Sequence, residues 1–385
     1  MTRELQIGVA LMLLLTVGYG CQPAGSGGGS LVTGLRVGAV LGEGRIGGEE
    51  RGESFARARA PAQLMFPRDH GPHPQFRSEW WYFTATLTDA AGEAYGAQFT
   101  LFRQALTPVT PQAGQNNPWQ ANQLYLGHLA ITDVGTQTHR EDQRLARAHP
   151  KLAGARDAPF GAWVDGWTLG SEGESLFPMR LSAQGDGLAL DLRLGGPGTK
   201  PIALQGAAGF SAKGPNSASY YYSLPRAPVA GTLRIDDRQV RVTGLGWIDR
   251  EWSTSVLSDG IVGWNWFGLH LDSGVDIMVF SLRRADGARD AFDAGTWIDG
   301  DGSVTPLGPG DFELRPGRVW RDATGRGWPV EWTLACARCG PGLVIEAALD
   351  DQRMDTSIVY WEGLVNVSDR DGNSRGNGYM ELTGY

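Results

Sequence analysis

The sequence predicts an all-β protein whose folded part consists of two similar antiparallel β-barrels in tandem. Composition is the first observation: 56 Gly, 14 Trp, 13 Phe and 10 Tyr accompany only 20% charged residues in 385, which suits short strands joined by glycine turns. After Phe66, short alternating apolar runs are bounded by Gly, Asp, Asn and Pro, as in half-buried strands. An internal repeat then sets the number of domains at two.

The repeat is a strand–turn–strand pattern that occurs in both halves of the folded region. Residues 81–103 are echoed by residues 265–283, and each begins with an aromatic cluster and ends in Phe-x-Leu and an arginine. Residues 167–191 are likewise echoed by residues 332–346, and each opens on Trp-Thr-Leu. A chance likeness is the alternative, because all β-strands favour the same residues.

Taken as a repeat, the pattern places a domain boundary near residue 240. We expect an N-terminal barrel over residues 64–240 and a C-terminal barrel over residues 241–385. A chain of this length fits two domains of ordinary size.

The N-terminus has the pattern of an export signal. Arg3 precedes an apolar run over residues 7–17 that is too short to span a bilayer, and Cys21 follows small residues. We predict a signal peptide over residues 1–20, with Cys21 acylated in a cell-envelope lipoprotein on the periplasmic or extracellular face. Gly18 stands where a larger aliphatic residue is usual, which leaves simple cleavage with secretion, or an uncleaved anchor, as alternatives.

Residues 21–63 are rich in Gly, Ala, Ser and Arg and show no stable period. Such a composition predicts a flexible tether that holds the folded part off the membrane to which the lipid is anchored.

Charge and motifs exclude several classes of function. The net charge of −8, without a basic stripe, excludes nucleic acid as a partner. Cys336 and Cys339 form a single C-x-x-C, which is insufficient for zinc but allows a disulfide in an oxidising compartment. His70 and His73 have no spaced partner, so we expect no metal site. Motifs of serine hydrolases and of nucleotide-binding loops do not occur in the sequence.

The segment over residues 244–252 is the richest in candidate chemistry. In an extended strand Trp247, Asp249 and Glu251 share one face, and Arg250 and Trp252 share the other. A carboxyl group buried beside indole rings has a raised pKa and keeps its proton at neutral pH, which makes a general acid. The alternative is that Asp249 or Glu251 pairs with Arg250 or another arginine as a structural ion pair.

Residues 263–272 alternate cleanly, with Trp264, Trp266 and His270 on one face. This face is predicted to line a cavity, with His270 as a candidate catalytic residue. The alternative is that the tryptophans are ordinary core and that the histidine is a satisfied structural residue.

The first half offers similar candidates for substrate binding. Glu79, Trp80 and Tyr82 lie in a cluster that carries rings on both strand faces, and His128 lies on another plausible strand. As in the second half, structural histidine and core aromatic residues are the alternative.

Four motifs in order, at residues 73–82, 246–252, 263–267 and 378–385, resemble the carotenoid 1,2-hydratase (hydroxyneurosporene synthase) and AttH-like superfamily. Exported members of this superfamily are often called predicted secreted hydrolases. The resemblance extends from about residue 64 to the end and implies two lipocalin-like barrels.

In the hydratase branch of that superfamily, water is added across a terminal isoprenoid double bond without a cofactor. The resemblance therefore implies a lyase that holds an apolar isoprenoid or lipid substrate in a barrel interior, where Asp249 or Glu251 protonates the alkene. Aromatic faces would stabilise the cation, and the candidates are Tyr82, Trp247, Trp252, Trp264 and Trp266. The export signal is a departure from that branch.

Two other functions remain open from the sequence. A lipocalin-like carrier of envelope lipids would need the aromatic cavity but no acid. A secreted hydrolase of unknown substrate would use two carboxylates, although Asp249 and Glu251 on one strand lie about 7 Å apart and point the same way.

Overall fold

The computed structural model describes residues 55–108, 122–255, 257–258 and 260–385. The predicted signal peptide, Cys21 and residues 21–54 of the predicted tether lie outside the described residues. Within the described ranges the one helix is the three-residue 3₁₀ turn η2 (Arg68–His70). In these same ranges no helix is long and apolar enough to cross a membrane.

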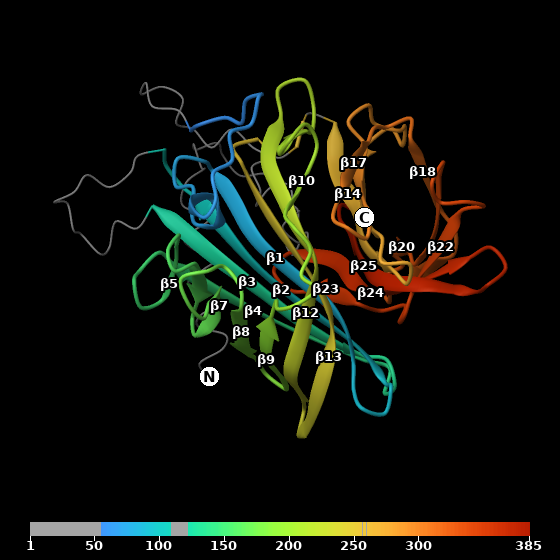
Figure 1. Ribbon diagram of the computed structural model, residues 1–385, viewed down its shortest axis with the longest axis horizontal. Coiled ribbons are helices and arrows are strands. Elements are labelled where there is room, and N and C mark those ends of the chain that lie inside the picture. Colours follow the sequence, from blue (N-terminus) through green and yellow to red (C-terminus); the bar gives the residue numbers. More distant parts are fainter. Residues whose placement is uncertain (1–54, 109–121, 256, 259) are drawn as a thin grey trace, which may run out of the picture. The chain divides into compact units, whose positions relative to one another are not determined.

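The described chain is all-β, as predicted, and forms two large antiparallel sheets (Figure 1). The first sheet, blue to yellow in Figure 1, contains β1 (Ser78–Thr88), β2 (Ala94–Ala105), β3 (Gln123–Asp133), β4 (Thr138–Arg147), β5 (Ala153–Arg156), β6 (Gly161–Val164), β7 (Trp167–Ser171), β8 (Met179–Gln184), β9 (Leu188–Leu194), β10 (Ala203–Leu204), β11 (Phe210–Ala212), β12 (Ala218–Ile235) and β13 (Arg238–Ser253). Its order is β4-β3-β2-β1-β13-β12-β9-β8-β7-β6-β5. β6 returns to pack against β2, β3 and β4, so the sheet curls into a barrel.

The second sheet, orange to red in Figure 1, curls in the same way. It contains β14 (Ile261–Leu271), β15 (Asp276–Arg284), β16 (Ala294–Ile298), β17 (Val304–Leu307), β18 (Phe312–Pro316), β21 (Glu331–Cys336), β22 (Leu343–Ala347), β23 (Arg353–Asp355), β24 (Val359–Asp369) and β25 (Ser374–Leu382). Its order is β17-β16-β15-β14-β25-β24-β22-β21-β18. A small separate ribbon pairs β19 (Val319–Arg321) with β20 (Gly327–Pro329).

The two strand orders superimpose and reveal the repeat. β1 and β2 correspond to β14 and β15, and the neighbours β13 and β12 correspond to β25 and β24. The echo between residues 81–103 and 265–283 therefore joins equivalent hairpins. The echo between residues 167–191 and 332–346 does not, because β8 lies between β7 and β9 whereas β21 pairs directly with β22.

The change from one sheet to the next falls later than residue 240. β13 runs through that position and pairs with β1 on one side and β12 on the other, so the second sheet begins only at β14. The last residues of the predicted tether are also part of the fold. The amide of Ala56 donates to the carbonyl of Gln75, and Arg59 hydrogen-bonds with the Tyr220 hydroxyl, which fixes this segment on the first barrel.

Three apolar layers form the core. Each barrel interior is filled by large side chains, with Trp81 and Phe83 in the first and Trp332 and Trp361 in the second. A third layer lies where the outer faces of the two sheets pack together. Close approach of the sheets requires Gly96 on β2, because a Cβ there would collide with the hydroxyl of Tyr379 on β25.

A buried ion cluster also joins the two sheets. Asp276, at the start of β15, accepts hydrogen bonds from His270 and Arg226 and lies 2.8 Å from the ammonium of Lys200. A β-bulge between Leu224 and Ala227 holds Arg226 at a φ of 53°, and its guanidinium reaches from β12 to the second sheet. The carboxylate is completely buried, so these cations stabilise its charge.

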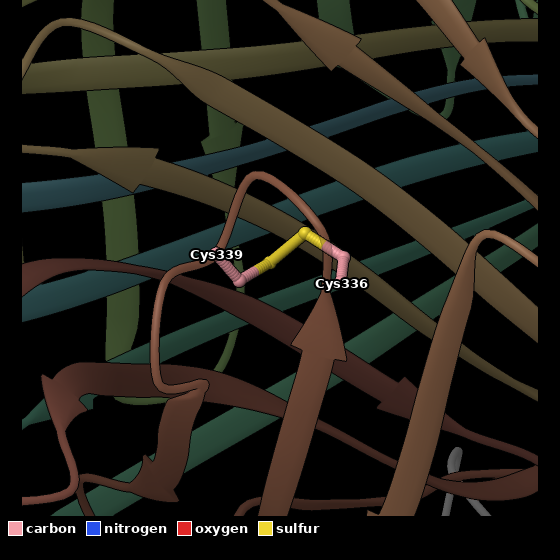
Figure 2. Close-up of a disulfide and its surroundings, with 2 residues drawn as sticks. All are labelled: Cys336 and Cys339. Atoms are coloured by element: carbon pink, nitrogen blue, oxygen red, sulfur yellow. A yellow bond between two sulfur atoms is a disulfide. The ribbon is translucent and has the colours of Figure 1, made fainter.

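Figure 2 shows the disulfide between Cys336 and Cys339, which joins the end of β21 to the turn that follows it. The sequence had left this pair as a possible disulfide. In the structure the amide of Cys339 also donates to the carbonyl of Cys336, so the bridge closes a tight turn.

Replacing Asp276 with asparagine is expected to lower the free energy of unfolding by about 3–5 kcal/mol, because it leaves buried Lys200 and partly buried Arg226 without their anion. Urea denaturation would measure the loss. Asp191→Asn is the control: it breaks an exposed pair with Arg180 and is expected to cost no more than about 1 kcal/mol. Equal losses in the two variants would show that the buried cluster does not hold the sheets together.

Candidate active site

The candidate active site is a cavity between the two sheets rather than inside a barrel. About 60 Å³ of it is open to the centres of water molecules, enough for several waters. The sequence had predicted a ligand in a barrel interior, but that space is filled by side chains. The cavity is lined by Trp80, Tyr82, Thr100, Phe102, Lys213, Tyr221, Asp249, Glu251, Leu257, Trp264, Trp266, Phe280, Leu282, Tyr360, Glu362 and Glu381.

Two rows of directly paired residues supply most of its chemistry. In the first sheet the row crosses four strands as Thr100, Tyr82, Asp249 and Ser223. In the second sheet the equivalent row is Phe280, Trp266, Glu381 and Glu362. The repeat therefore places Glu381 at the position that Asp249 occupies in the first barrel.

Asp249 is buried and accepts three hydrogen bonds. The Tyr221 hydroxyl donates to Oδ2 at 2.5 Å, while the Ser223 hydroxyl and the Trp247 indole N–H donate to Oδ1 at 2.5 and 2.7 Å. Burial raises the pKa of Asp249 to about 7, and the three donors oppose this rise because they favour the charged form. Asp249 is therefore poised to exchange a proton near neutral pH.

Glu362 and Glu381 face each other on β24 and β25. Burial raises the pKa of Glu362 well above its ordinary range, and the neighbouring Glu381 raises it further. Burial also raises the pKa of Glu381 to about 8, with Asp249 and Glu251 adding to the effect. Since adjacent carboxyl groups resist ionising together, this pair holds at least one proton at neutral pH.

Glu251 has a different environment from the other carboxyl groups. It accepts a hydrogen bond from the Ser219 hydroxyl and lies 3.3 Å from the ammonium of Lys213. The lysine also lies 3.9 Å from the centre of the Phe280 ring. Glu251 is therefore an ion-paired carboxylate, which corresponds to the structural alternative left open by the sequence, with lysine in place of arginine.

The predicted site residues divide into two groups. Trp80, Tyr82, Asp249, Glu251, Trp264 and Trp266 meet at the cavity, and Trp247 binds Asp249 from behind it. Four others lie elsewhere. His270 belongs to the Asp276 cluster, and His128 lies behind Tyr360, whose hydroxyl is 2.8 Å from its Nδ1. Glu79 and Trp252 point into the first barrel, because they lie on the other strand faces.

Inside the first barrel, Glu79 is a structural anion. Arg103, Arg250 and His73 surround it and hold its pKa well below the ordinary range. A second cavity, of about 200 Å³, opens nearby and is lined by Trp252, His73 and Asp69 among others. Asp69 pairs with Arg68, and His73 and Arg68 together lower the pKa of Asp69. Glu79 and Asp69 both have lowered pKa values, so neither carboxylate has a proton to donate near neutral pH, and the cavity between the sheets is the better candidate.

Sequence reasoning missed Glu362 and Glu381. The signal for Glu381 was present, since residues 247–249 and 379–381 both read aromatic, aliphatic, acidic on equivalent strands. Glu362 follows a tryptophan on β24 without a similar signal, because its counterpart in the first barrel is Ser223.

Among the described residues there is no cluster of three or more acidic, histidine or cysteine side chains suited to a metal ion.

Comparison with known proteins places the chain in a family. A sequence model of the AttH-like family matches residues 57–385. The crystal structure of a protein from Nitrosomonas europaea, described as an AttH, is 34% identical and superimposes with a TM-score of 0.75 over 86% of this chain and all of that one. Kievitone hydratase from Nectria haematococca shares the fold, with a TM-score of 0.63 over 86% of this chain and 96% of that one, at 17% identity.

A curated relative is the dehydratase asqC of Emericella nidulans, which is 25% identical over 187 residues. The match covers 43% of this chain and 48% of that enzyme, so the chain spans about half of the relative's length.

Replacing Glu381 with glutamine is expected to reduce the loss of stability with rising pH between pH 6.5 and 8, to which Asp249 and Glu362 also contribute. The folded state holds a proton on Glu381 up to about pH 8, whereas the unfolded state loses it near 4.5. The wild type therefore loses stability as pH rises through this window. Unfolded His70, His128 and His139 lose their protons near its lower end, but they do so in both proteins, so their contribution cancels in the comparison.

Urea denaturation at intervals across the window would measure the slope for both proteins. Glu313→Gln is the control, because this exposed carboxylate pairs with Arg315, has a lowered pKa and is ionised throughout. A slope for Glu381→Gln as steep as that of wild type would mean that Glu381 is not protonated in the folded protein.

Proposed function

Since the chain belongs to the AttH-like family, we propose that it is a hydratase-type lyase, which adds water to a double bond of an apolar small molecule or removes it. One observation carries the proposal: a cavity of about 60 Å³ walled by aromatic rings holds three carboxyl groups, Asp249, Glu362 and Glu381, whose pKa values are all raised. Such groups can both give and take a proton near neutral pH.

The walls suit the intermediates of that chemistry. The rings of Tyr82 and Trp266 meet edge to face at 5.2 Å, and Trp264 and Phe280 complete an apolar lining. Faces of such rings stabilise a carbocation that forms when an alkene is protonated or a hydroxyl leaves.

The size of the cavity bears on the substrate. About 60 Å³ is far below the 300–1,000 Å³ of ordinary ligand pockets, so only the reacting end of a long substrate would be enclosed without movement of the walls. An acyclic isoprenoid with its terminal double bond or hydroxyl in the cavity meets this condition. The proposed substrate class is therefore an isoprenoid-like or similar apolar molecule that presents one small end.

The names of the relatives agree with this proposal. The matched region of asqC belongs to an enzyme called a dehydratase, and kievitone hydratase has the same fold. We also propose that the protein is exported and lipid-anchored, as the N-terminal pattern predicts. Cys21, the proposed site of acylation, lies outside the described residues.

Replacing Asp249 with asparagine is expected to lower turnover by about 10²–10⁴-fold, because it removes one proton-transfer group from the cavity. The measurement is mass spectrometry of apolar molecules that co-purify with each protein from a host producing acyclic carotenoids. Wild type is expected to carry molecules that differ from the host's own by one water, and the variant to carry unreacted ones.

Asp293→Asn is the matched control. Asp293 is also buried with a pKa raised to about 6 by burial, but it binds the Leu282 amide and does not line the cavity. It is expected to retain turnover. Identical unmodified lipids bound to wild type and to Asp249→Asn would favour a carrier instead.

A further inference from the structure

The hydrogen bonds around Asp249 fix the direction of its donors. The indole N–H of Trp266 donates to the Tyr221 hydroxyl at 3.1 Å, and the Gln205 amide donates to the Ser223 hydroxyl at 2.7 Å. Each hydroxyl thus accepts from an N–H group and directs its own proton to Asp249. With the Trp247 N–H, three donors point at one carboxyl group, which is the environment of a carboxylate acceptor.

Glu362 has the opposite environment. Its side chain is 1% exposed, and its Oε1 has no hydrogen-bond partner among the described residues. No cation contributes to its pKa, and its carboxyl neighbour is Glu381. The Tyr82 and Tyr360 hydroxyls lower the pKa of Glu362, but burial and the neighbouring Glu381 outweigh them, so Glu362 keeps its proton.

A second unsatisfied atom faces the same space. Six buried side-chain atoms in the described part of the chain lack a hydrogen-bond partner, and of these only Tyr82 Oη and Glu362 Oε1 belong to residues that line the cavity. Tyr82 is the direct strand neighbour of Asp249, and its phenol also interacts with Glu362. The two groups are near enough to affect each other's pKa, but neither atom has a partner in hydrogen-bonding geometry. Because buried polar atoms are rarely left unpaired, an oxygen atom of a ligand that binds both is expected here.

We propose that Tyr82 and Glu362 bind the hydroxyl of an alcohol substrate, that neutral Glu362 is the catalytic acid, and that the Asp249 carboxylate is the base. The resting site is then arranged to eliminate water rather than to add it. This inference rests on the proposed lyase function, names its substrate as an alcohol, and reverses the role that the sequence predicted for Asp249.

The step balances as follows. Glu362 gives its proton to the hydroxyl oxygen, and the C–O bond breaks with its electron pair to release water. Asp249 takes a proton from the neighbouring carbon, and the electrons of that C–H bond form the double bond. The cycle closes when the proton on Asp249 passes to Glu362 through the released water. Hydration is the same path in reverse and starts from the opposite protonation state.

Several other charged or titratable groups lie around Asp249. They are Glu251 on β13, Tyr221 on β12, Tyr82 on β1 and Glu381 on β25, and Lys213 lies beside Glu251 and Tyr221.

The first test is infrared spectroscopy at pH 7, which separates protonated carboxylic acids from carboxylates without any substrate. The difference spectrum between wild type and Glu362→Gln is expected to show loss of a carboxylic acid C=O band. The spectrum for Asp249→Asn is expected to show loss of carboxylate bands together with part of an acid band, since the pKa of Asp249 is about 7. Loss of the acid band in Asp249→Asn but not in Glu362→Gln would overturn the assignment.

Tyr82→Phe gives an answer if Glu362→Gln does not fold. Removal of the hydroxyl is expected to shift the Glu362 acid band without abolishing it, because the interaction with Glu362 is lost. An unchanged band would overturn the shared oxygen site.

The second test is binding of a matched pair of small probes, 2-methylbutan-2-ol and 2-methylbut-2-ene, followed by tryptophan fluorescence at pH 7. Wild type is expected to bind the alcohol at least about tenfold more tightly than the alkene, and Tyr82→Phe is expected to lose this preference. Equal binding of both probes by wild type would overturn the proposal. Turnover enters neither test, so a protein without any lyase activity would contradict the proposed function while the oxygen site and its acid stand.

Discussion

Burial of carboxyl groups between two sheets, without a cation for each, is the constraint on which the rest of this structure depends. A carboxylate in such a place loses its hydration, so it must either receive hydrogen bonds or keep its proton. Asp249 follows the first course, with three donors from its own sheet. Glu362 follows the second, with one oxygen unpaired. The contrast between the two gives an acid and a base in one small cavity.

Other buried anions of the molecule do have cations, and they behave differently. Asp276 binds Arg226 and Lys200 and its pKa is lowered, and Glu79 is held between two arginines inside the first barrel. Both are permanently charged and fully partnered, which suits a role in holding elements together. The position of the cations therefore separates the carboxylates that maintain the fold from the carboxyl groups that can exchange protons.

The internal repeat explains why the cavity needs both barrels. Equivalent positions carry Asp249 and Glu381, while Ser223 in the first barrel corresponds to Glu362 in the second. The first barrel thus supplies a carboxylate with its donors, and the second supplies a buried acidic pair without a cation. Neither barrel alone contains the base and the acid, so the site depends on the packing of the two outer faces, which the bulge at Arg226 and the small Gly96 allow.

The sequence by itself determined the all-β class, the repeated hairpin and the face on which Asp249 lies beside Trp247, because alternation along a strand is a local property. It also brought Trp264 and Trp266 onto one face. Only the tertiary structure decided which faces meet. Glu79 and Trp252 went into a barrel, His270 joined an ion cluster, and Glu362 and Glu381 entered the cavity. Strand periodicity specifies two faces but not which other elements pack against each face. The pKa of a carboxyl group depends on that packing, because burial and neighbouring groups set it.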